Sequence, residues 1–194
     1  VESRAMDDAD PINPQRVIWE LSKRLPDNAL IACDTGSGTN WYARQYRARE
    51  GQIGSLAGGL ATMCPGVPYI TAAKFCPPDR PGFAIVGDGA IQMMGNAALI
   101  TVAKYWKQWS DPRLVVLVLN NGDLNQVTWE QRVMEGDPKA VVSQDIPDFA
   151  YDKYAEQLGF IGLRMEKTDD VERVWDEAMR RDRPVVINAY VDAD

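Results

Sequence analysis

The sequence predicts an α/β fold, doubly wound, with a mostly parallel sheet and helices on both faces. Two continuous apolar runs, residues 83–86 and 114–119, carry this prediction. Such runs are typical of strands that are buried on both faces of a sheet. Between them, the apolar residues of 90–109 recur at helical spacing, which indicates a strand, helix, strand unit with parallel strands.

The rest of the chain continues this alternation of strands and helices. Further strands are expected at residues 29–33, 160–165 and 184–191, and helices at residues 14–25, 41–47, 60–75, 148–158 and 169–181. Asn13 is the expected N-cap of the first helix, and Pro14 lies in its first turn. Residues 54–59 are expected to be small and flexible, and residues 122–147 form a polar segment. Residues 1–10 are charged and irregular, which is typical of a linker, so one domain is expected at 11–194.

Composition excludes several classes of function. The net charge is −7, from 21 basic and 28 acidic residues, which argues against nucleic acid as a partner. No apolar run reaches the roughly 18 residues of a membrane span, and no signal peptide is visible. Three cysteines without CxxC spacing argue against a zinc site and favour a reduced, cytoplasmic setting. The absence of histidine excludes a Ser-His-Asp triad, a Cys-His pair and a histidine metal site.

Polar residues follow the two central strands. Gly87, Asp88 and Gly89 end the first strand, and Asn121 follows the second. The carboxyl ends of parallel strands open on one edge of the sheet, where doubly wound proteins bind ligands. The glycines permit a close approach of the backbone, and a helix that begins near Ala90 offers N–H groups to a phosphate. Asp88 would repel a bare phosphate, by roughly 4 kcal/mol at about 4 Å, so a bridging cation is expected. Carboxylate and amide oxygens favour Mg²⁺.

Other interpretations of these residues stay open. Gly-Asp-Gly alone, or Asn-Asn-Gly alone, is typical of an ordinary turn. The segment Thr35-Gly36-Ser37-Gly38 follows the strand at 29–33, and it is either a third wall of the same crevice or a connecting loop. It lacks GxGxxG spacing, which disfavours a nicotinamide dinucleotide site.

Gly-Asp-Gly, a helix, a buried strand and Asn-Asn together resemble the thiamine diphosphate-dependent enzymes. Residues 57–63 resemble the glycine-leucine-methionine stretch of acetolactate synthases, and residues 79–81 and 13–15 are also similar. The resemblance runs from about residue 11 to residue 191 and is to the C-terminal diphosphate-binding domain of the acetolactate synthase and pyruvate oxidase group. It implies the thiamine diphosphate-binding fold, thiamine diphosphate and Mg²⁺ as cofactors, a 2-oxo acid substrate and a homo-oligomer. FAD, where the full enzyme uses it, would bind a different domain.

The resemblance also implies roles for individual residues. Asp88 and Asn121 match the family's magnesium ligands, with the main-chain carbonyl of Asp123 as the third. Met63 matches the bulky apolar residue that supports the bent cofactor; a core methionine is the alternative. The other implied cofactor-binding residues are Gly36, Ser37, Gly38, Gly87, Gly89, Ala90 and Leu124, and residues 124–130 would cover the active site. The sequence departs from the family at Cys64, where a glycine is common, and by extra residues within 107–113.

No catalytic residue is expected in this chain. The family's activating glutamate lies on a pyrimidine-binding domain of the same or a partner subunit, and that domain is not recognisable in this sequence. The resemblance therefore implies that the chain does not turn over substrate by itself. Two alternatives are a separate subunit of a split thiamine diphosphate decarboxylase, as in sulfopyruvate decarboxylases, and a non-catalytic module that keeps the fold.

Overall fold

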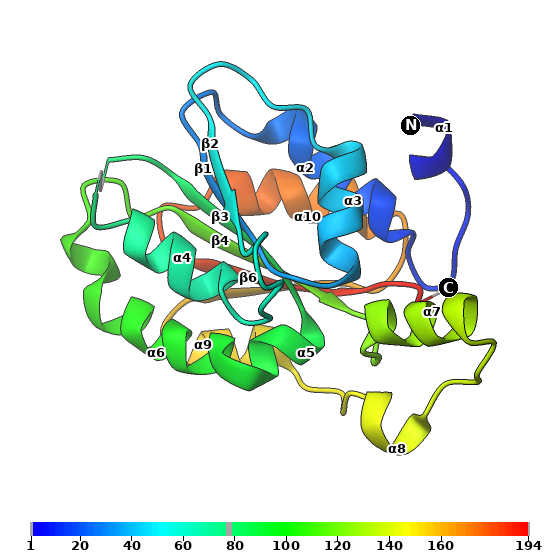
Figure 1. Ribbon diagram of the computed structural model, residues 1–194. Helices are drawn as coiled ribbons and strands as arrows, with labels where there is room; N and C mark the ends of the chain where they lie inside the picture. Colours follow the sequence, from blue (N-terminus) through cyan, green and yellow to red (C-terminus); the bar gives the residue numbers. More distant parts are fainter. Residues whose placement is uncertain (1, 77–78, 194) are drawn as a thin grey trace.

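A six-stranded, wholly parallel sheet with helices on both faces forms the centre of the molecule (Figure 1). The computed structural model describes residues 2–76 and 79–193. The strand order is β2-β1-β3-β4-β6-β5. The strands are β1 (Leu30–Cys33), β2 (Ile53–Leu56), β3 (Gly82–Gly87), β4 (Leu114–Asn120), β5 (Ile161–Met165) and β6 (Val185–Tyr190). The predicted fold class is confirmed.

The two central strands are buried on both faces, which explains their continuous apolar sequences. β3 and β4 pair from Gly82 with Leu114 to Gly87 with Leu119. Phe83 and Ile85 pack into the core on one face of the sheet, and the alternate residues of β3 pack into the core on the other. The strand, helix, strand unit therefore forms as its sequence predicts.

Each face of the sheet carries its own layer of helices (Figure 1). One layer contains α2 (Pro14–Arg24), α3 (Ser37–Gln45) and α10 (Asp170–Met179), and the other contains α4 (Gly66–Ala73), α6 (Asn96–Tyr105) and α9 (Tyr151–Gln157). In the first layer the fully buried Trp175 donates from Nε1 to the carbonyl of Val17, at 3.0 Å. None of the helices in the described part of the chain has the length and apolar character needed to cross a membrane.

The helix after β3 is continuous but not uniform. It runs through α5 (Asp88–Ala90), a π-helical turn at Ile91–Gly95, α6, and a 3₁₀ turn at Trp106–Gln108. At Gly95 an added Cβ would lie 2.6 Å from Cγ1 of Ile91, so the wide turn leaves no room for a side chain there. Such turns occur frequently at functional sites.

Two predictions between β1 and β3 are wrong. The helix expected at 60–75 begins only at Gly66, because Pro65 lies at its N-cap position and proline is tolerated only at the start of a helix. The residues expected to be flexible, 54–59, include most of β2. All four residues of this edge strand are exposed, so it lacks the apolar periodicity that identifies a buried strand.

Several other boundaries differ from the predictions. The helix expected at 41–47 spans Ser37–Gln45, and the polar segment 122–147 contains α7 (Asn125–Met134) and α8 (Val141–Gln144). The helix expected at 148–158 is α9. The expected linker, 1–10, includes the short helix α1 (Glu2–Ala5), and the Asn13 amide donates to the carbonyls of Arg4 and Asp7. The boundary between a linker and a domain at residue 11 stays a prediction.

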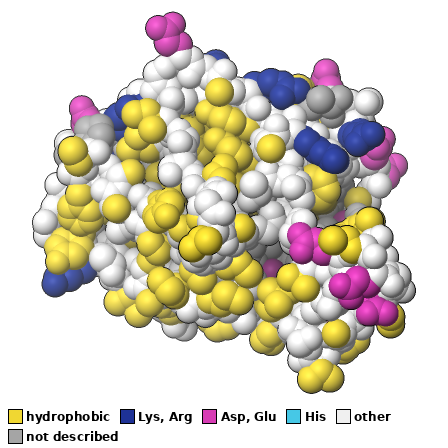
Figure 2. Space-filling view, in the orientation of Figure 1, with side chains coloured by type: hydrophobic (Ala, Val, Ile, Leu, Met, Phe, Trp, Pro, Cys, Tyr) yellow, Lys and Arg dark blue, Asp and Glu magenta, His cyan; other side chains and the backbone are white. Residues whose placement is uncertain are grey.

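Apolar side chains cover much of the surface of the second helical layer, on the near side of the molecule (Figure 2). Large exposed apolar side chains of its helices are Tyr69 on α4, Met93 and Met94 on the π-helical turn, and Ile100 on α6. Contiguous apolar surface of this kind often marks a site of contact with another protein surface.

Candidate functional site

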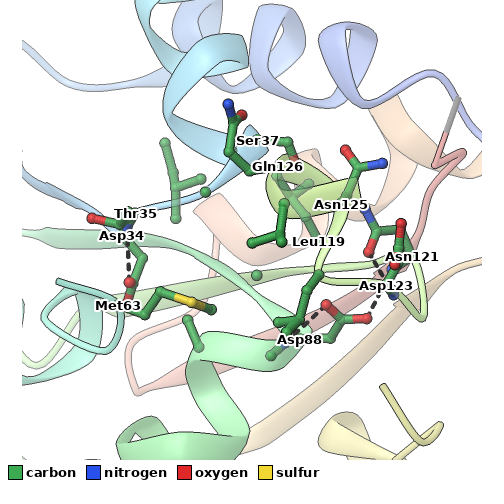
Figure 3. Close-up of a pocket in the computed structure, with 18 residues that line it drawn as sticks. Asp34, Thr35, Ser37, Met63, Asp88, Leu119, Asn121, Asp123, Asn125 and Gln126 are labelled. Carbon is green, nitrogen blue, oxygen red and sulfur yellow. Dashed lines mark hydrogen bonds between the residues drawn. The ribbon is translucent and has the colours of Figure 1, made fainter. Parts of the chain in front are cut away.

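A cleft opens at the carboxyl ends of β1, β3 and β4 (Figure 3). After β1 the chain turns toward the edge strand β2, whereas after β3 it turns toward β4. Adjacent strands whose connections leave in opposite directions create the crevice in which doubly wound proteins bind ligands. Residues from four separate segments line it: Asp34, Thr35, Gly36, Ser37, Gly38, Met63, Ile85, Gly87, Asp88, Gly89, Ala90, Leu119, Asn121, Asp123, Leu124, Asn125, Gln126 and Val127.

Asp88 is a deeply buried charged residue of the cleft. It is only 2% exposed, and it begins the helix directly after β3. Its Oδ1 accepts a hydrogen bond from the N–H of Gly89 at 2.9 Å. Its Oδ2 accepts from the N–H groups of Asn121 and Gly122, at 3.1 and 2.6 Å. One carboxylate therefore joins the ends of β3 and β4 and brings the segment of Asn121 next to Asp88.

Burial also changes the acidity of Asp88. It raises the pKa of this carboxyl to about 6, although the N–H groups of Gly122, Gly89 and Asn121 stabilise the ionised form. Within residues 2–76 and 79–193, main-chain N–H groups donate to the Asp88 carboxylate, and no lysine or arginine forms an ion pair with it. A bound cation would favour the ionised form of this group.

The loop after β4 turns sharply at Gly122, whose φ of +66° suits glycine. Oδ1 of Asn121 accepts from the N–H of Asp123 at 3.1 Å, which fixes the amide in a local turn. The Asp123 carboxylate is engaged elsewhere: its Oδ1 accepts from the Thr128 hydroxyl at 2.9 Å and lies 3.0 Å from Nζ of Lys139. The carboxylate of Asp123 is therefore occupied, and the group of this residue that is expected to bind a metal ion is its main-chain carbonyl.

The segment after β1 forms the opposite wall. Gly36 is the N-cap of α3, with a φ of +126°, and Ser37 and Gly38 lie in the first turn of this helix. An added Cβ at Gly36 would meet nothing within 4 Å, and the same is true at Gly87 across the cleft. At both glycines the backbone is therefore open to the close approach of a ligand.

Met63 lies in the turn before α4, and its side chain reaches into the cleft (Figure 3). An added Cβ on Gly89 would lie 3.4 Å from Cε of Met63 and 2.8 Å from Cδ2 of Leu124. The two apolar side chains thus converge over the Gly-Asp-Gly turn, and Figure 3 shows Met63 reaching into the pocket.

The outer rim of the cleft is closed by contact between α3 and α7. Nδ2 of Asn40 donates to Oε1 of Gln126 at 2.7 Å, and Nε2 of Gln126 donates to Oε1 of Glu130 at 3.0 Å. These exposed contacts link the segment that follows the Asn121 loop to the segment that follows β1.

The donor chemistry of the cleft fits a magnesium ion and a diphosphate. The donors at the Asp88 end are oxygens: a carboxylate, an amide and main-chain carbonyls, which are ligands that Mg²⁺ prefers. Within residues 2–76 and 79–193, no three His, Cys, Asp or Glu side chains gather into a metal site. A site with one carboxylate needs oxygens from the ligand as well, which a diphosphate supplies.

The structure brings all eleven residues of the predicted cofactor set into this one cleft, from Gly36 to Leu124. Their roles as ligands stay predictions. The prediction did not include Asp34, whose buried carboxylate accepts three N–H hydrogen bonds beside the cleft. The sequence signal that could have identified Asp34 is an acidic residue directly after a predicted strand, which is also the signal that identified Asp88. Gln126 and Asn125 were also missed as individual residues, because they lie on a helix that the sequence does not reveal.

Comparison with known proteins identifies the family of this chain. The family described as "Thiamine pyrophosphate enzyme, C-terminal TPP binding domain" matches residues 34–189. A putative thiamine pyrophosphate-containing protein, YdaP of Bacillus subtilis, is 30% identical over 191 residues, which cover 98% of this chain and 32% of that protein.

Two mycobacterial relatives are similar over almost the same region. Acetolactate synthase of Mycobacterium leprae is 33% identical, and acetolactate synthase large subunit IlvB1 of Mycobacterium tuberculosis is 34% identical. In each case the match covers 94% of this chain and 29% of the relative. The chain spans about a third of the length of the curated relatives that it matches.

Proposed function

Because the chain belongs to the C-terminal TPP binding domain family of thiamine pyrophosphate enzymes, we propose that it binds thiamine diphosphate through Mg²⁺ held at Asp88. The observation that carries this proposal is the buried Asp88 carboxylate, which is hydrogen-bonded to the loop of Asn121 at the carboxyl ends of β3 and β4. The proposed metal ligands are Asp88, the amide oxygen of Asn121 and the main-chain carbonyl of Asp123.

The remaining cleft residues would orient the cofactor. The diphosphate would be bound by backbone groups on both walls of the cleft, at Gly89 and Ala90 on one side and at Gly36, Ser37 and Gly38 on the other. Gly87 has no side chain and would leave space for the diphosphate. Met63 and Leu124 would support the apolar part of the cofactor and exclude water from it. When bound, thiamine diphosphate supplies an electron sink for breaking a bond next to a 2-oxo group.

The reaction that we propose is decarboxylation or carboligation of a 2-oxo acid, as part of an acetolactate synthase-like enzyme. It requires a glutamate on a pyrimidine-binding domain of the same or a partner subunit. The exposed apolar surface over α4 and α6 (Figure 2) supports docking of such a domain, because it leaves large apolar side chains uncovered. We expect no turnover of pyruvate by this chain alone.

Calorimetric titration with thiamine diphosphate, with and without Mg²⁺, tests the proposal. We expect binding that depends on Mg²⁺ and that falls by about tenfold or more in Asp88→Asn, which weakens a charged metal ligand. Glu20→Gln is the control, because Glu20 is a buried carboxylate on α2 that lies outside the cleft lining. Binding that is indifferent to Mg²⁺ and to Asp88→Asn would refute the metal site, and no binding at all would favour a non-catalytic module.

A further inference from the structure

The turn that carries Met63 has an unusual backbone. Ala61 has a φ of +50° and Cys64 a φ of +90°, and these are the two non-glycine residues with positive φ in the described ranges, 2–76 and 79–193. Such conformations are unfavourable for residues with a side chain and persist only where the surroundings enforce them. Met63 lies between these two residues, so its placement depends on whatever holds the turn.

The Asp34 carboxylate is hydrogen-bonded to this turn. Asp34 is at the end of β1 and is 3% exposed. Oδ1 accepts from the N–H of Cys64 at 2.8 Å, and Oδ2 accepts from the N–H of Gly66 at 2.9 Å. Oδ1 also accepts from the N–H of Thr35 at 2.8 Å. The two long-range bonds connect the turn at residues 61–66 to the sheet across about thirty positions of sequence.

The fit around Asp34 is tight. An added Cβ on Gly66 would lie 3.0 Å from Oδ2 of Asp34 and 2.6 Å from Cγ1 of Val86. The carboxylate, Gly66 and β3 are therefore in close contact, with no space for the turn to shift toward the sheet. Asp34 itself is fixed, because its N–H donates to the carbonyl of Ile85 at 2.8 Å and its own carbonyl accepts from the Thr39 hydroxyl.

We propose that Asp34 is a positioning residue, whose buried carboxylate holds the strained turn at residues 61–66 so that Met63 projects into the cofactor cleft. The proposal rests on the proposed function for the identity of the ligand that Met63 supports. Figure 3 shows Asp34 and Met63 side by side at one end of the pocket, opposite Asp88.

The chemistry requires a carboxylate at this position. Both oxygens of Asp34 accept N–H groups, whereas asparagine has one acceptor oxygen and an NH₂ group that donates. Asparagine would therefore turn its NH₂ toward the N–H of either Cys64 or Gly66 and lose that bond. Burial raises the pKa of the Asp34 carboxyl, and the N–H groups of Gly66, Cys64 and Thr35 oppose this by stabilising the ionised form.

A cofactor-free experiment tests the positioning directly. The chain is labelled with ¹³C-methyl methionine, the Met63 signal is assigned with Met63→Leu, and amide exchange is measured at Cys64 and Gly66. In Asp34→Asn we expect the Met63 methyl signal to shift or broaden and exchange at these amides to accelerate by about tenfold, the effect of losing one buried hydrogen bond. Glu20→Gln, the buried control outside the cleft, should leave both readouts unchanged.

The second variant is Asp34→Asn combined with Cys64→Gly. Glycine adopts a φ of +90° without strain, so it relieves the strain at residue 64 that the Asp34 hydrogen bonds oppose. We expect the double variant to restore the Met63 methyl signal. An unchanged signal in Asp34→Asn overturns the proposal, and so does a double variant that stays as perturbed as the single one.

Titration with thiamine diphosphate and Mg²⁺ separates this inference from the proposed function. Failure of the unsubstituted chain to bind refutes the proposed function, while the methyl and exchange readouts still decide the role of Asp34. If the unsubstituted chain binds, we expect an affinity about tenfold weaker in Asp34→Asn, equivalent to about 1.4 kcal/mol, and recovery with Cys64→Gly. Unaltered affinity in Asp34→Asn would overturn the role of Asp34 in the cleft.

Discussion

Lys74 gives the sharpest test of the electrostatics of this fold, because it is fully buried at the end of α4. Its Nζ donates to the carbonyls of Arg80 and Asp111 and lies 5.4 Å from the centre of the Trp109 ring. Burial lowers the pKa of Lys74 from 10.5 to about 8, with Asp111 opposing the shift and Arg113 adding to it. The amine keeps its donors when neutral, so both protonation states can bind the two carbonyls.

The shift makes stability depend on pH in a defined direction. Below pH about 8 both the folded and the unfolded chain hold the proton, whereas between about 8 and 10.5 only the unfolded chain does. Unfolding therefore takes up a proton in that window, and the free energy of unfolding rises with pH. One pKa unit is 1.36 kcal/mol, so the gain is about 1–3 kcal/mol after allowance for solvent screening.

Urea unfolding, followed by tryptophan fluorescence from pH 7 to 10, measures this gain as the difference between the unsubstituted chain and Lys74→Met. Comparing the two proteins cancels the contribution of groups that both contain, such as Tyr42, whose raised pKa makes the free energy of unfolding fall as the pH rises. Lys153→Met, at an exposed lysine, is the matched control and should show no pH-dependent difference. If the free energies of unfolding of the unsubstituted chain and of Lys74→Met differ by the same amount at every pH from 7 to 10, the reasoning is refuted.

Two further perturbations test packing and the loop after β4. Trp175→Phe removes the donor to the buried Val17 carbonyl, so we expect a loss of about 1–3 kcal/mol in urea unfolding, and an unchanged midpoint would contradict this. Nζ of Lys139 lies 3.0 Å from a carboxylate oxygen of Asp123 and 2.6 Å from one of Asp145. Lys139→Met removes both ion pairs, so we expect the local stability of residues 124–145 to fall by about 1 kcal/mol and limited proteolysis within them to become about fivefold faster. Equal cleavage rates would show that these ion pairs do not restrain the segment.

The sequence predicted the fold and the cleft where its signals were local. β3 and β4 are buried on both faces, so their apolar runs identify them, and parallel pairing then places Asp88 and Asn121 at one edge. The eleven predicted residues meet in the cleft because each lies at or near the end of a strand or in a turn between elements.

The missed features depend on contacts between distant parts of the chain. β2 is an exposed edge strand that pairs with β1, and no periodicity of its sequence reveals it. α7 buries Asn125 and Thr128, which are polar, so its sequence resembles a loop. The role of Asp34 depends on N–H groups about thirty residues away. Cys64 adopts a φ of +90°, a conformation that suits glycine and that its sequence position does not reveal.

The segment between the Asn121 loop and β5 has a consequence for how such a protein can diversify. The N–H of Leu124 donates to the carbonyl of Gln144 at 2.8 Å, and the N–H of Ile146 donates to the carbonyl of Gly122 at 3.0 Å. The chain therefore leaves and re-enters the body of the protein at almost the same place, with α7 and α8 in between. Evolution can lengthen, shorten or replace this excursion at little entropic cost, while the sheet and the Asp88 carboxylate stay where they are.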